Sequence, residues 1–279
     1  SGAITRPMHG LYPCFFEHDS VEKRLLATQF ESHHAREVFP CIDEPEAKAS
    51  FALSLTTDKN DVVVSNTPIA SESTAGERKT TIFEATPIMS TYLLAWVSGE
   101  LIYEEATSAH GIQVRTYATP VHAGKLAYSV EVACKSMDFM DDYFDIAYPL
   151  QKFDQIALPD FAAGAMENWG CVTFRESALL YDPKLSDLTD KQYVAEVVIH
   201  EMSHQWFGNL VTMRWWEDLW LNEGFASWIP YLVRDDLYPE WKMWEQFATG
   251  DLMIGLRADA LENTHPIVVE INSPDEIRS

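Results

Sequence analysis

The segment His200-Glu201-Met202-Ser203-His204 constrains this chain of 279 residues more than any other feature of its sequence. Positions i and i+4 of a helix lie on the same face, so a helix here directs both imidazoles to one side. Apolar residues recur around the segment with helical spacing, which predicts a helix over Leu188–Phe207, with Thr189 or Asp190 as its N-cap. The sequence therefore predicts one helix that presents two metal ligands side by side.

The two histidines have the spacing of two ligands of a tetrahedral zinc ion. A third ligand must come from elsewhere, and Glu223 lies in the next helical segment. Two histidines and one glutamate leave a fourth position for water, which is typical of catalytic zinc sites. Glu201 lies beside the ligands, where its carboxylate can reach a metal-bound water without displacing a ligand. Short segments of this pattern also occur by chance, so the following carboxylate helix is what favours a catalytic site with one zinc ion.

The chain divides by texture into a β-rich part, residues 1–104, and a mixed part with long helices, residues 105–279, which predicts an α+β fold. Short apolar runs between turn residues predict strands at Phe51–Thr56, Val62–Ser65, Thr80–Glu84, Tyr92–Val97 and Ile112–Thr119. Helical periodicity predicts further helices over Gly124–Phe144, Trp216–Asp235 and Pro239–Arg257. Pro230 falls inside one of them, so we expect a kink or break near Ala226–Pro230.

The net negative charge of the sequence argues against nucleic acids as partners. The sequence has 43 Asp and Glu against 20 Lys and Arg, a net charge of −23, whereas nucleic-acid binding depends on Lys and Arg. No stretch is apolar for long enough to predict a membrane segment, and no leader peptide is visible at the start. Four widely spaced cysteines favour reduced thiols, and with them a cytoplasmic protein.

A second segment, Gly164-Ala165-Met166-Glu167-Asn168, would by itself indicate only a glycine-containing strand with one carboxylate. Together with the histidine segment and Glu223, it resembles the gluzincin zinc aminopeptidases, the family of the puromycin-sensitive and membrane alanyl aminopeptidases. The resemblance extends through almost the whole chain. The segments that match in order are Thr28–Glu31, Phe39–Pro45, Pro87–Tyr92, Asp160–Gly170 and His200–Trp228.

The resemblance implies a role for each matching residue. His200, His204 and Glu223 are similar to the family's zinc ligands, and Glu201 to its general base, which takes a proton from the zinc-bound water. The substrate is implied to be a peptide with a free N-terminus. Its backbone would lie along Gly164, Ala165, Met166, Glu167 and Asn168. Glu167 and Glu31 would hold its ammonium group, and Gln29 would lie near the first side-chain pocket.

The resemblance also implies a fold that this chain would contain in part. It implies a partial N-terminal β-saddle domain, followed by a thermolysin-like zinc domain with a small mixed sheet and helices. We expect the family's helical C-terminal domain to be missing, together with the transition-state tyrosine that lies further beyond the third ligand than the chain extends. One alternative is therefore an impaired zinc-binding fragment. A second is the epoxide-hydrolysing leukotriene branch of the family, which typically has glycine where Ala165 stands.

Several other groups have simpler interpretations. We expect His33 and His34 to be exposed loop residues, and Asp141 and Asp142 to lie on the solvated face of a helix. An aromatic cluster is predicted to form core around the histidine helix: Trp206, Phe207, Trp215, Trp216 and Trp220. Trp169 and Phe174 follow the substrate segment and are candidates for lining its pocket.

Overall fold

The computed structural model describes residues 8–277, and its first sheet is antiparallel with four strands. The strand order is β1-β2-β7-β4, with bounds Gly10–His18, Val21–Gln29, Trp96–Gly99 and Val62–Ser65. Asp19 and Ser20 join β1 to β2 with positive φ values of 54° and 62°, the conformation that a two-residue hairpin turn requires. Gln29 is the last residue of β2, and Glu31 follows two residues later.

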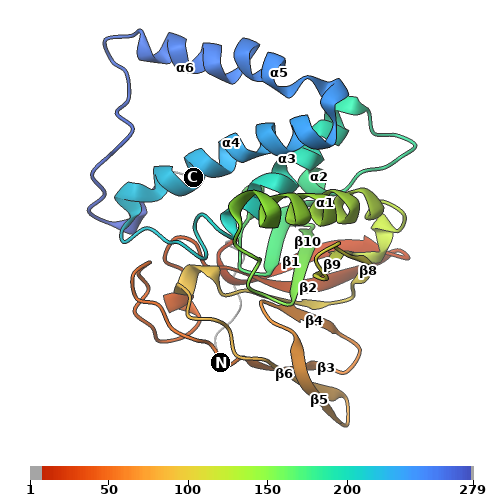
Figure 1. The fold of residues 1–279 in the computed structure, drawn as a ribbon. Coiled ribbons are helices and arrows are strands. Elements are labelled where there is room, and N and C mark those ends of the chain that lie inside the picture. The colour runs from red at the N-terminus through yellow and green to blue at the C-terminus, as the bar shows by residue number, and fades with distance from the viewer. Residues whose placement is uncertain (1–7, 278–279) are drawn as a thin grey trace.

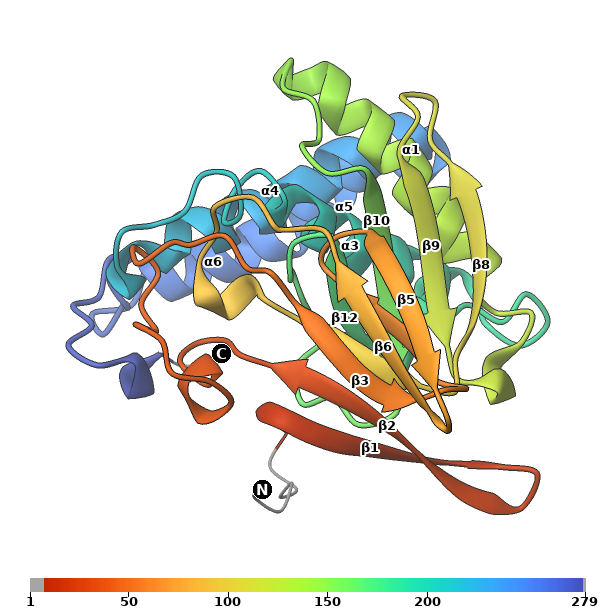
Figure 2. The ribbon, with the colours of Figure 1, turned by 90° about the horizontal axis from the view of Figure 1, so that it is seen from below.

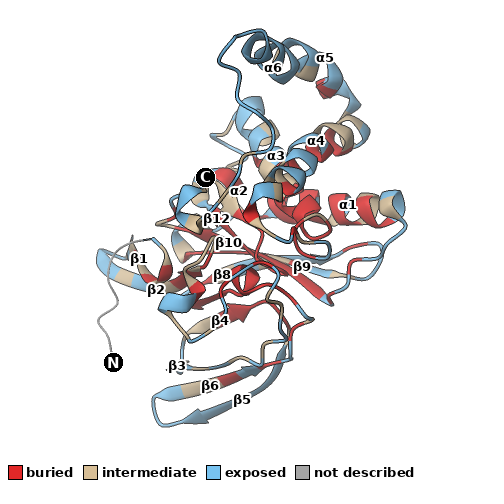
Figure 3. Cartoon of the chain, turned by 90° about the vertical axis from the view of Figure 1, so that its left-hand side faces the viewer, coloured by how far each residue is buried: buried red, intermediate tan, exposed pale blue. Residues whose placement is uncertain are grey.

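A three-stranded antiparallel sheet of β3 (Ser54–Asp58), β6 (Arg78–Phe83) and β5 (Ile69–Ala75) lies beside the first sheet (Figure 1). Every residue of β5 is exposed, and Figure 3 shows this edge as the most solvated part of the β-rich region. The predicted strand at Val62–Ser65 is confirmed, whereas the run Tyr92–Val97 begins with a 3₁₀ turn at Thr91–Leu93.

The third sheet is mixed and has five strands in the order β11-β12-β10-β9-β8. Strands β9, β10 and β12 are parallel, and β8 and β11 pair antiparallel at the two edges. All seven residues of β10 are buried, as is typical of a parallel strand covered on both faces. The bounds are Ile102–Thr107 (β8), Gln113–Ala118 (β9), Lys152–Leu158 (β10), Ala165–Met166 (β11) and Cys171–Arg175 (β12).

Helices α1, α3 and α4 lie on one side of the five-stranded sheet, and α5 and α6 extend beyond them (Figures 1 and 2). The helices are α1 (Ala127–Phe144), α2 (Glu176–Leu179), α3 (Leu188–His204), α4 (Leu219–Leu237), α5 (Met243–Thr249) and α6 (Asp251–Asp259). Further 3₁₀ turns are Ala35–Glu37, Pro120–His122, Trp216–Asp218, Pro239–Trp241 and Pro274–Glu276. The α+β architecture is thus confirmed. None of the helices within residues 8–277 combines the length and apolar character that a membrane crossing requires.

Two helix predictions need correction. Helix α4 continues through Pro230, so the predicted break is wrong and only the predicted kink stays a prediction; the buried face of the helix (Ala226, Ile229 and Val233) packs into the core and offsets the lost hydrogen bond. The single helix expected over Pro239–Arg257 is instead a 3₁₀ turn, α5 and α6, separated at Gly250 by a non-helical backbone (φ −102°, ψ −100°).

Three burial predictions also need correction. Asp141 is buried, because its carboxylate accepts a hydrogen bond of 2.8 Å from the backbone N–H of Tyr148, and only Asp142 is solvated. Trp220 lies on an exposed part of α4, whereas Trp206 and Trp216 are core residues as predicted. The third correction concerns His33 and His34, which are half-buried. Trp169 and Phe174 are buried, and their place in the lining of a substrate pocket stays a prediction.

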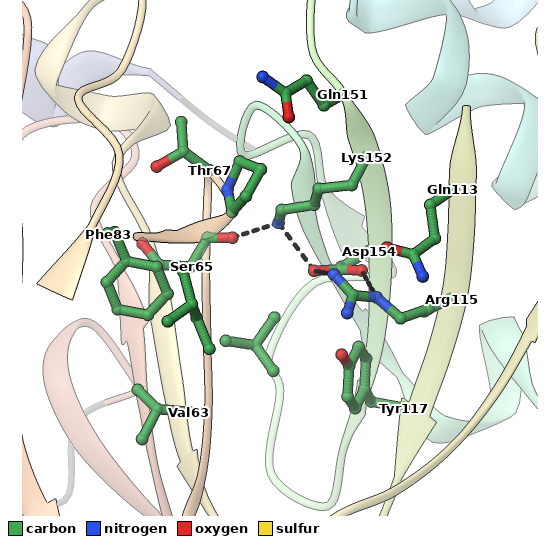
Figure 4. A pocket seen from close by; sticks show the side chains of 13 residues that line it. Val63, Ser65, Thr67, Phe83, Gln113, Arg115, Tyr117, Gln151, Lys152 and Asp154 are labelled. Atoms are coloured by element: carbon green, nitrogen blue, oxygen red, sulfur yellow. Dashed lines mark hydrogen bonds and ion pairs between the residues drawn. The ribbon is translucent and has the colours of Figure 1, made fainter. Parts of the chain in front are cut away.

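The two larger sheets meet at a buried charge network (Figure 4). Asp154 of β10 accepts hydrogen bonds from Arg115 of β9 (2.7 and 3.1 Å) and forms an ion pair with Lys152 at 2.7 Å. The Lys152 ammonium also donates to the carbonyl of Ser65 in β4 and, at 2.7 Å, to that of Gly170. A cavity of about 230 Å³ adjoins the network, lined by residues of both parts of the chain.

Candidate active site

Helix α3 carries the histidine segment and begins with two reciprocal hydrogen bonds. The Asp187 carboxylate accepts from the Asp190 N–H, and the Asp190 carboxylate accepts from the Asp187 N–H, both at 3.0 Å. This capping box satisfies two backbone donors that the first turn would otherwise leave free. The N-cap is therefore Asp187, and the predicted N-cap at Thr189 or Asp190 was wrong because Asp190 occupies the third helical position.

Helix α4 brings Glu223 to the histidines because it packs along α3. Arg234, which is only 2% exposed, crosses between the two helices. Its Nη1 lies 2.8 Å from the Glu196 carboxylate on α3, and its Nε donates to the Pro230 carbonyl at 3.0 Å. The guanidinium therefore fixes how α4 lies against α3 and, with it, the position of Glu223.

The side chains of His200, His204 and Glu223 form a compact triangle. The two Nε2 atoms are 3.0 Å apart, and the Glu223 carboxylate oxygens lie 3.5 Å from His200 Nε2 and 3.6 Å from His204 Nε2. Two ligands of a tetrahedral zinc ion with bonds of 2.0–2.1 Å are about 3.3 Å apart. The triangle thus has the dimensions of a three-residue metal site, and the predicted residues are the ones brought together.

The orientation of His204 also fits a metal ligand. Its Nδ1 lies 3.0 Å from the Phe207 carbonyl, so this nitrogen carries the proton and Nε2 presents its lone pair to the triangle. Burial lowers the pKa of His204 and favours the neutral form that binds metals. Gly208 follows with φ +130°, and a β-carbon there would lie only 3.3 Å from the Asn222 amide. The chain can turn this closely behind the histidine because it has glycine at this position.

Four carboxylates converge on this region, and two of them have oxygens without a partner. Burial, and then the charges of Glu167, Glu223 and Glu31, raise the pKa of Glu201 well above its usual value. Burial and the Glu223 charge raise the pKa of Glu167 to about 7. Within residues 8–277, Glu201 Oε2 and Glu167 Oε1 have no hydrogen-bond partner although both are buried. Bound cations would offset the cost of holding these carboxylates close together and away from water.

Glu223 differs from the other acids. Burial opposes its ionisation, but the hydrogen bond with His200 and the neighbouring imidazoles lower its pKa overall. An ionised carboxylate is the protonation state that a divalent metal requires of a glutamate ligand.

The segment with Glu167 forms the edge of the mixed sheet. Ala165 and Met166 make up β11, which pairs on one side with Phe174 and Thr173 of β12. At the start of the segment, the Gly164 carbonyl accepts from the Arg175 N–H at 2.9 Å. An edge strand can accept the backbone of an extended peptide as an additional strand.

Two amides fix Glu167 to the end of the histidine helix. The Glu167 carbonyl accepts hydrogen bonds from Asn209 Nδ2 at 2.8 Å and from Gln205 Nε2 at 3.3 Å. Gln205 Oε1 also accepts from the Gly170 N–H at 3.2 Å, and Asn168 closes the turn by donating to the Thr173 hydroxyl at 3.1 Å. Gln205 and Asn209 were not predicted as site residues, because their only signal in the sequence is one amide directly after His204 and a second amide five residues after it.

Glu31 approaches the same region from the first sheet. Burial, and then the charges of Glu167 and Glu223, raise its pKa well above the usual value, which brings it into this group of acids. Gln29 Oε1 is buried and has no hydrogen-bond partner within residues 8–277. The predicted place of Gln29 near a side-chain pocket stays a prediction.

Comparison with known proteins finds family matches in both parts of the chain. Residues 128–279 match the Peptidase family M1 domain, and residues 1–93 match the Peptidase M1 N-terminal domain. The chain belongs to peptidase family M1. It is 49% identical to Aminopeptidase M1 of Arabidopsis thaliana over 99% of this chain and 31% of that protein. It is 46% identical to Aminopeptidase N of Lactococcus lactis subsp. cremoris (strain MG1363) over 98% of this chain and 32% of that protein.

This M1 chain therefore spans about a third of the length of the curated relatives that it matches. Both M1 domains contribute to the group of acids, because Glu31 lies in the N-terminal match and Glu167, Glu201 and Glu223 lie in the peptidase match. The boundary that we predicted at residue 104 stays a prediction. It falls within β8, which pairs with β9 in the mixed sheet.

Proposed function

We propose that this chain carries the active site of a zinc-dependent aminopeptidase, which hydrolyses the N-terminal peptide bond of peptides. The observation that supports the proposal is that a candidate metal site lies next to a candidate site for the substrate's ammonium group. A triangle with metal-site dimensions, formed by His200, His204 and Glu223, lies next to the buried Glu167 and the half-buried Glu31, which can hold a substrate's ammonium group.

Zinc is the metal that best fits this donor set. Two imidazole nitrogens and one carboxylate are typical of catalytic zinc sites, and they suit zinc better than the oxygen-preferring ions magnesium and calcium. A bound zinc ion supplies Lewis acidity, which activates a water molecule and polarises the scissile carbonyl. The residues that would hold it are His200, His204 and Glu223, with the Phe207 carbonyl orienting His204.

In this proposal Glu201 moves the proton. Its carboxylate accepts a proton from the attacking water and then donates it to the departing amine. The raised pKa of Glu201 supports the role, because burial and neighbouring acids favour a carboxyl group that holds a proton for part of the cycle. The free Oε2 atom leaves one oxygen available for this transfer.

Glu167 and Glu31 would bind the free amino terminus of the substrate. An ammonium ion next to them would offset the burial and the repulsion that together raise the pKa of Glu31, so these acids favour a cationic terminus over an acylated one. The substrate backbone would extend along Gly164–Asn168, where β11 offers an unpaired strand edge. A terminus held at a fixed distance from the metal limits cleavage to the first peptide bond.

The test is hydrolysis of aminoacyl-aminomethylcoumarin substrates, measured with and without a zinc chelator. We expect turnover that the chelator abolishes and added zinc restores, and no turnover of the N-acetylated substrates. Stoichiometric zinc binding without chelator-sensitive turnover would favour the impaired-fragment alternative. Turnover of an epoxide substrate that exceeds the peptidase activity would favour the leukotriene branch over the assignment based on Ala165.

Two matched variants separate the roles of the acids. Glu201→Gln should lower kcat by about 10² to 10⁴-fold with zinc content unchanged, because only the proton transfer is lost. Glu167→Gln should mainly raise KM for free-amine substrates, also with zinc content unchanged. A loss of zinc in either variant would contradict the assignment of that residue.

Two further expectations remain part of the proposal. A C-terminal domain outside this chain would complete the enzyme, as the length of the relatives supports. A cytoplasmic location still rests on the sparse cysteines, of which all four are free thiols in the structure. Cell fractionation tests it.

A further inference from the structure

A second group of two histidines and one glutamate lies at the start of the first sheet. His9 directly precedes β1, His34 precedes the 3₁₀ turn Ala35–Glu37, and Glu37 ends that turn. The Glu37 carboxylate bridges the two rings, with His9 Nδ1 at 2.8 Å from one oxygen and His34 Nδ1 at 2.9 Å from the other. The imidazoles stack on each other with centroids 4.2 Å apart and an angle of 26° between the ring planes.

The backbone leaves space for this arrangement. Gly10 has φ +65°, and a β-carbon at this position would lie 2.8 Å from Glu37 Oε2, which is closer than such atoms approach. The carboxylate therefore occupies the space that any other side chain at position 10 would take. Burial opposes ionisation of Glu37, but the hydrogen bonds from His34 and His9 lower its pKa overall, so it stays a carboxylate.

We propose that His9, His34 and Glu37 form a second site for a divalent transition metal, and that it binds Zn²⁺ through the two Nδ1 atoms and the carboxylate. The donor set is the one found in the triangle on α3 and α4, with Nδ1 in place of Nε2. To bind the ion through Nδ1, each ring would carry its proton on Nε2. Nothing in this proposal depends on peptidase activity.

The distances allow the site to close with small movements. The three ligand atoms lie within 4.8 Å of one another, whereas ligands of a tetrahedral zinc ion are about 3.3 Å apart. The two oxygen–nitrogen distances would lengthen by about 0.5 Å, and the two nitrogens would approach by at most about 1.5 Å. All three side chains are half-exposed, at 23% to 42%, so an ion can reach them from solvent and waters can complete its coordination.

His33 supplies the matched control. It stacks on His34 with centroids 4.6 Å apart, but its own nitrogens face Ser32 Oγ at 2.9 Å and Asp275 at 3.1 Å. His33 therefore resembles His34 in sequence position and ring stacking, and it contributes no donor atom to the group around Glu37.

The experiment counts zinc ions on the full chain after dialysis against micromolar Zn²⁺, by mass spectrometry of the metal. We expect two ions per chain in the unmodified protein and in His33→Gln, and one in His34→Gln. In zinc titrations of the Glu223→Gln background, which weakens the other triangle, His34→Gln should raise the Kd of the remaining site at least about tenfold. Anomalous scattering at the zinc edge should place a peak between His9, His34 and Glu37.

Either of two results would overturn the proposal. One is the same zinc content in His34→Gln as in the unmodified chain, with no anomalous peak beside Glu37. The other is equal loss of zinc in His33→Gln and His34→Gln, which would make ring stacking, not ligation, responsible. Thermal unfolding of each variant checks that folding is retained.

Discussion

Substitution of Asp154 by asparagine should destabilise this protein more than any loss of a surface ion pair. Asp154 is 1% exposed and neutralises two cations, Lys152 and Arg115, at the junction of two sheets (Figure 4). Asparagine keeps the shape of the side chain and removes its charge. The variant therefore leaves the Lys152 ammonium, only 2% exposed, with the neutral carbonyls of Ser65 and Gly170 as its remaining partners.

The expected loss in the free energy of unfolding depends on which of the two cations stays buried without a partner. Removing one partner of a buried ion pair costs about 3–5 kcal/mol, because the other charge is left uncompensated. The Arg115 side chain is 22% exposed and borders the cavity, so water can solvate it in part. We therefore expect a loss near the lower limit, about 3 kcal/mol, which is a large part of the 5–15 kcal/mol typical of folded proteins.

The assay is urea unfolding, compared with two other variants. Asp58→Asn removes a similar partner from an exposed pair, in which Arg78 lies 3.0 Å from Asp58 and the side chains are 57% and 72% exposed. It should cost at most about 1 kcal/mol. Lys152→Met keeps the bond between Arg115 and Asp154 and should cost less than Asp154→Asn. Equal losses in the free energy of unfolding for Asp154→Asn and Asp58→Asn would refute the reasoning.

Three further predictions concern the metal, the substrate segment and a thiol. Chelation should lower the unfolding midpoint reversibly, since zinc at a hundred times its Kd adds about 2.7 kcal/mol; an unchanged midpoint would contradict a bound ion. Asn209→Ala removes the 2.8 Å hydrogen bond to the Glu167 carbonyl. It should lower kcat/KM several-fold in steady-state assays and reduce the free energy of unfolding by about 1 kcal/mol. Unchanged kinetics would exclude a positioning role. Burial, and then the Asp138 charge, raise the pKa of Cys134 to about 11, so iodoacetamide labelling of Cys134 should rise steeply only at strongly alkaline pH. Rapid labelling at pH 8 would contradict this environment.

The metal triangle could be predicted from sequence because its geometry is mostly local. A helix places residues 200 and 204 on one face whatever surrounds it, and a second helix needs only one correctly placed acid. The strand Val62–Ser65 could also be predicted from local sequence, because a short apolar run between turn residues is typical of a strand.

The remaining features depend on contacts between distant segments. Pro230 leaves α4 intact because core packing offsets its cost, and residue spacing contains no information on that packing. Asp141 is buried because a backbone N–H seven residues later satisfies it. Gln205 and Asn209 acquire a role only when the segment at Glu167 folds back onto α3. The helix predicted over Pro239–Arg257 divides at Gly250, where glycine weakens the helix and α6 buries no residue to hold it in line.

The most direct test of the central claim is mass spectrometry of an unlabelled peptide incubated with the purified protein. We predict products that shorten by one residue at a time from the N-terminus, a reaction that stops with a zinc chelator, and no cleavage of the same peptide after N-acetylation. Internal cleavage, or equal cleavage of the acetylated peptide, would contradict a site in which Glu31 and Glu167 hold the amino terminus beside the metal.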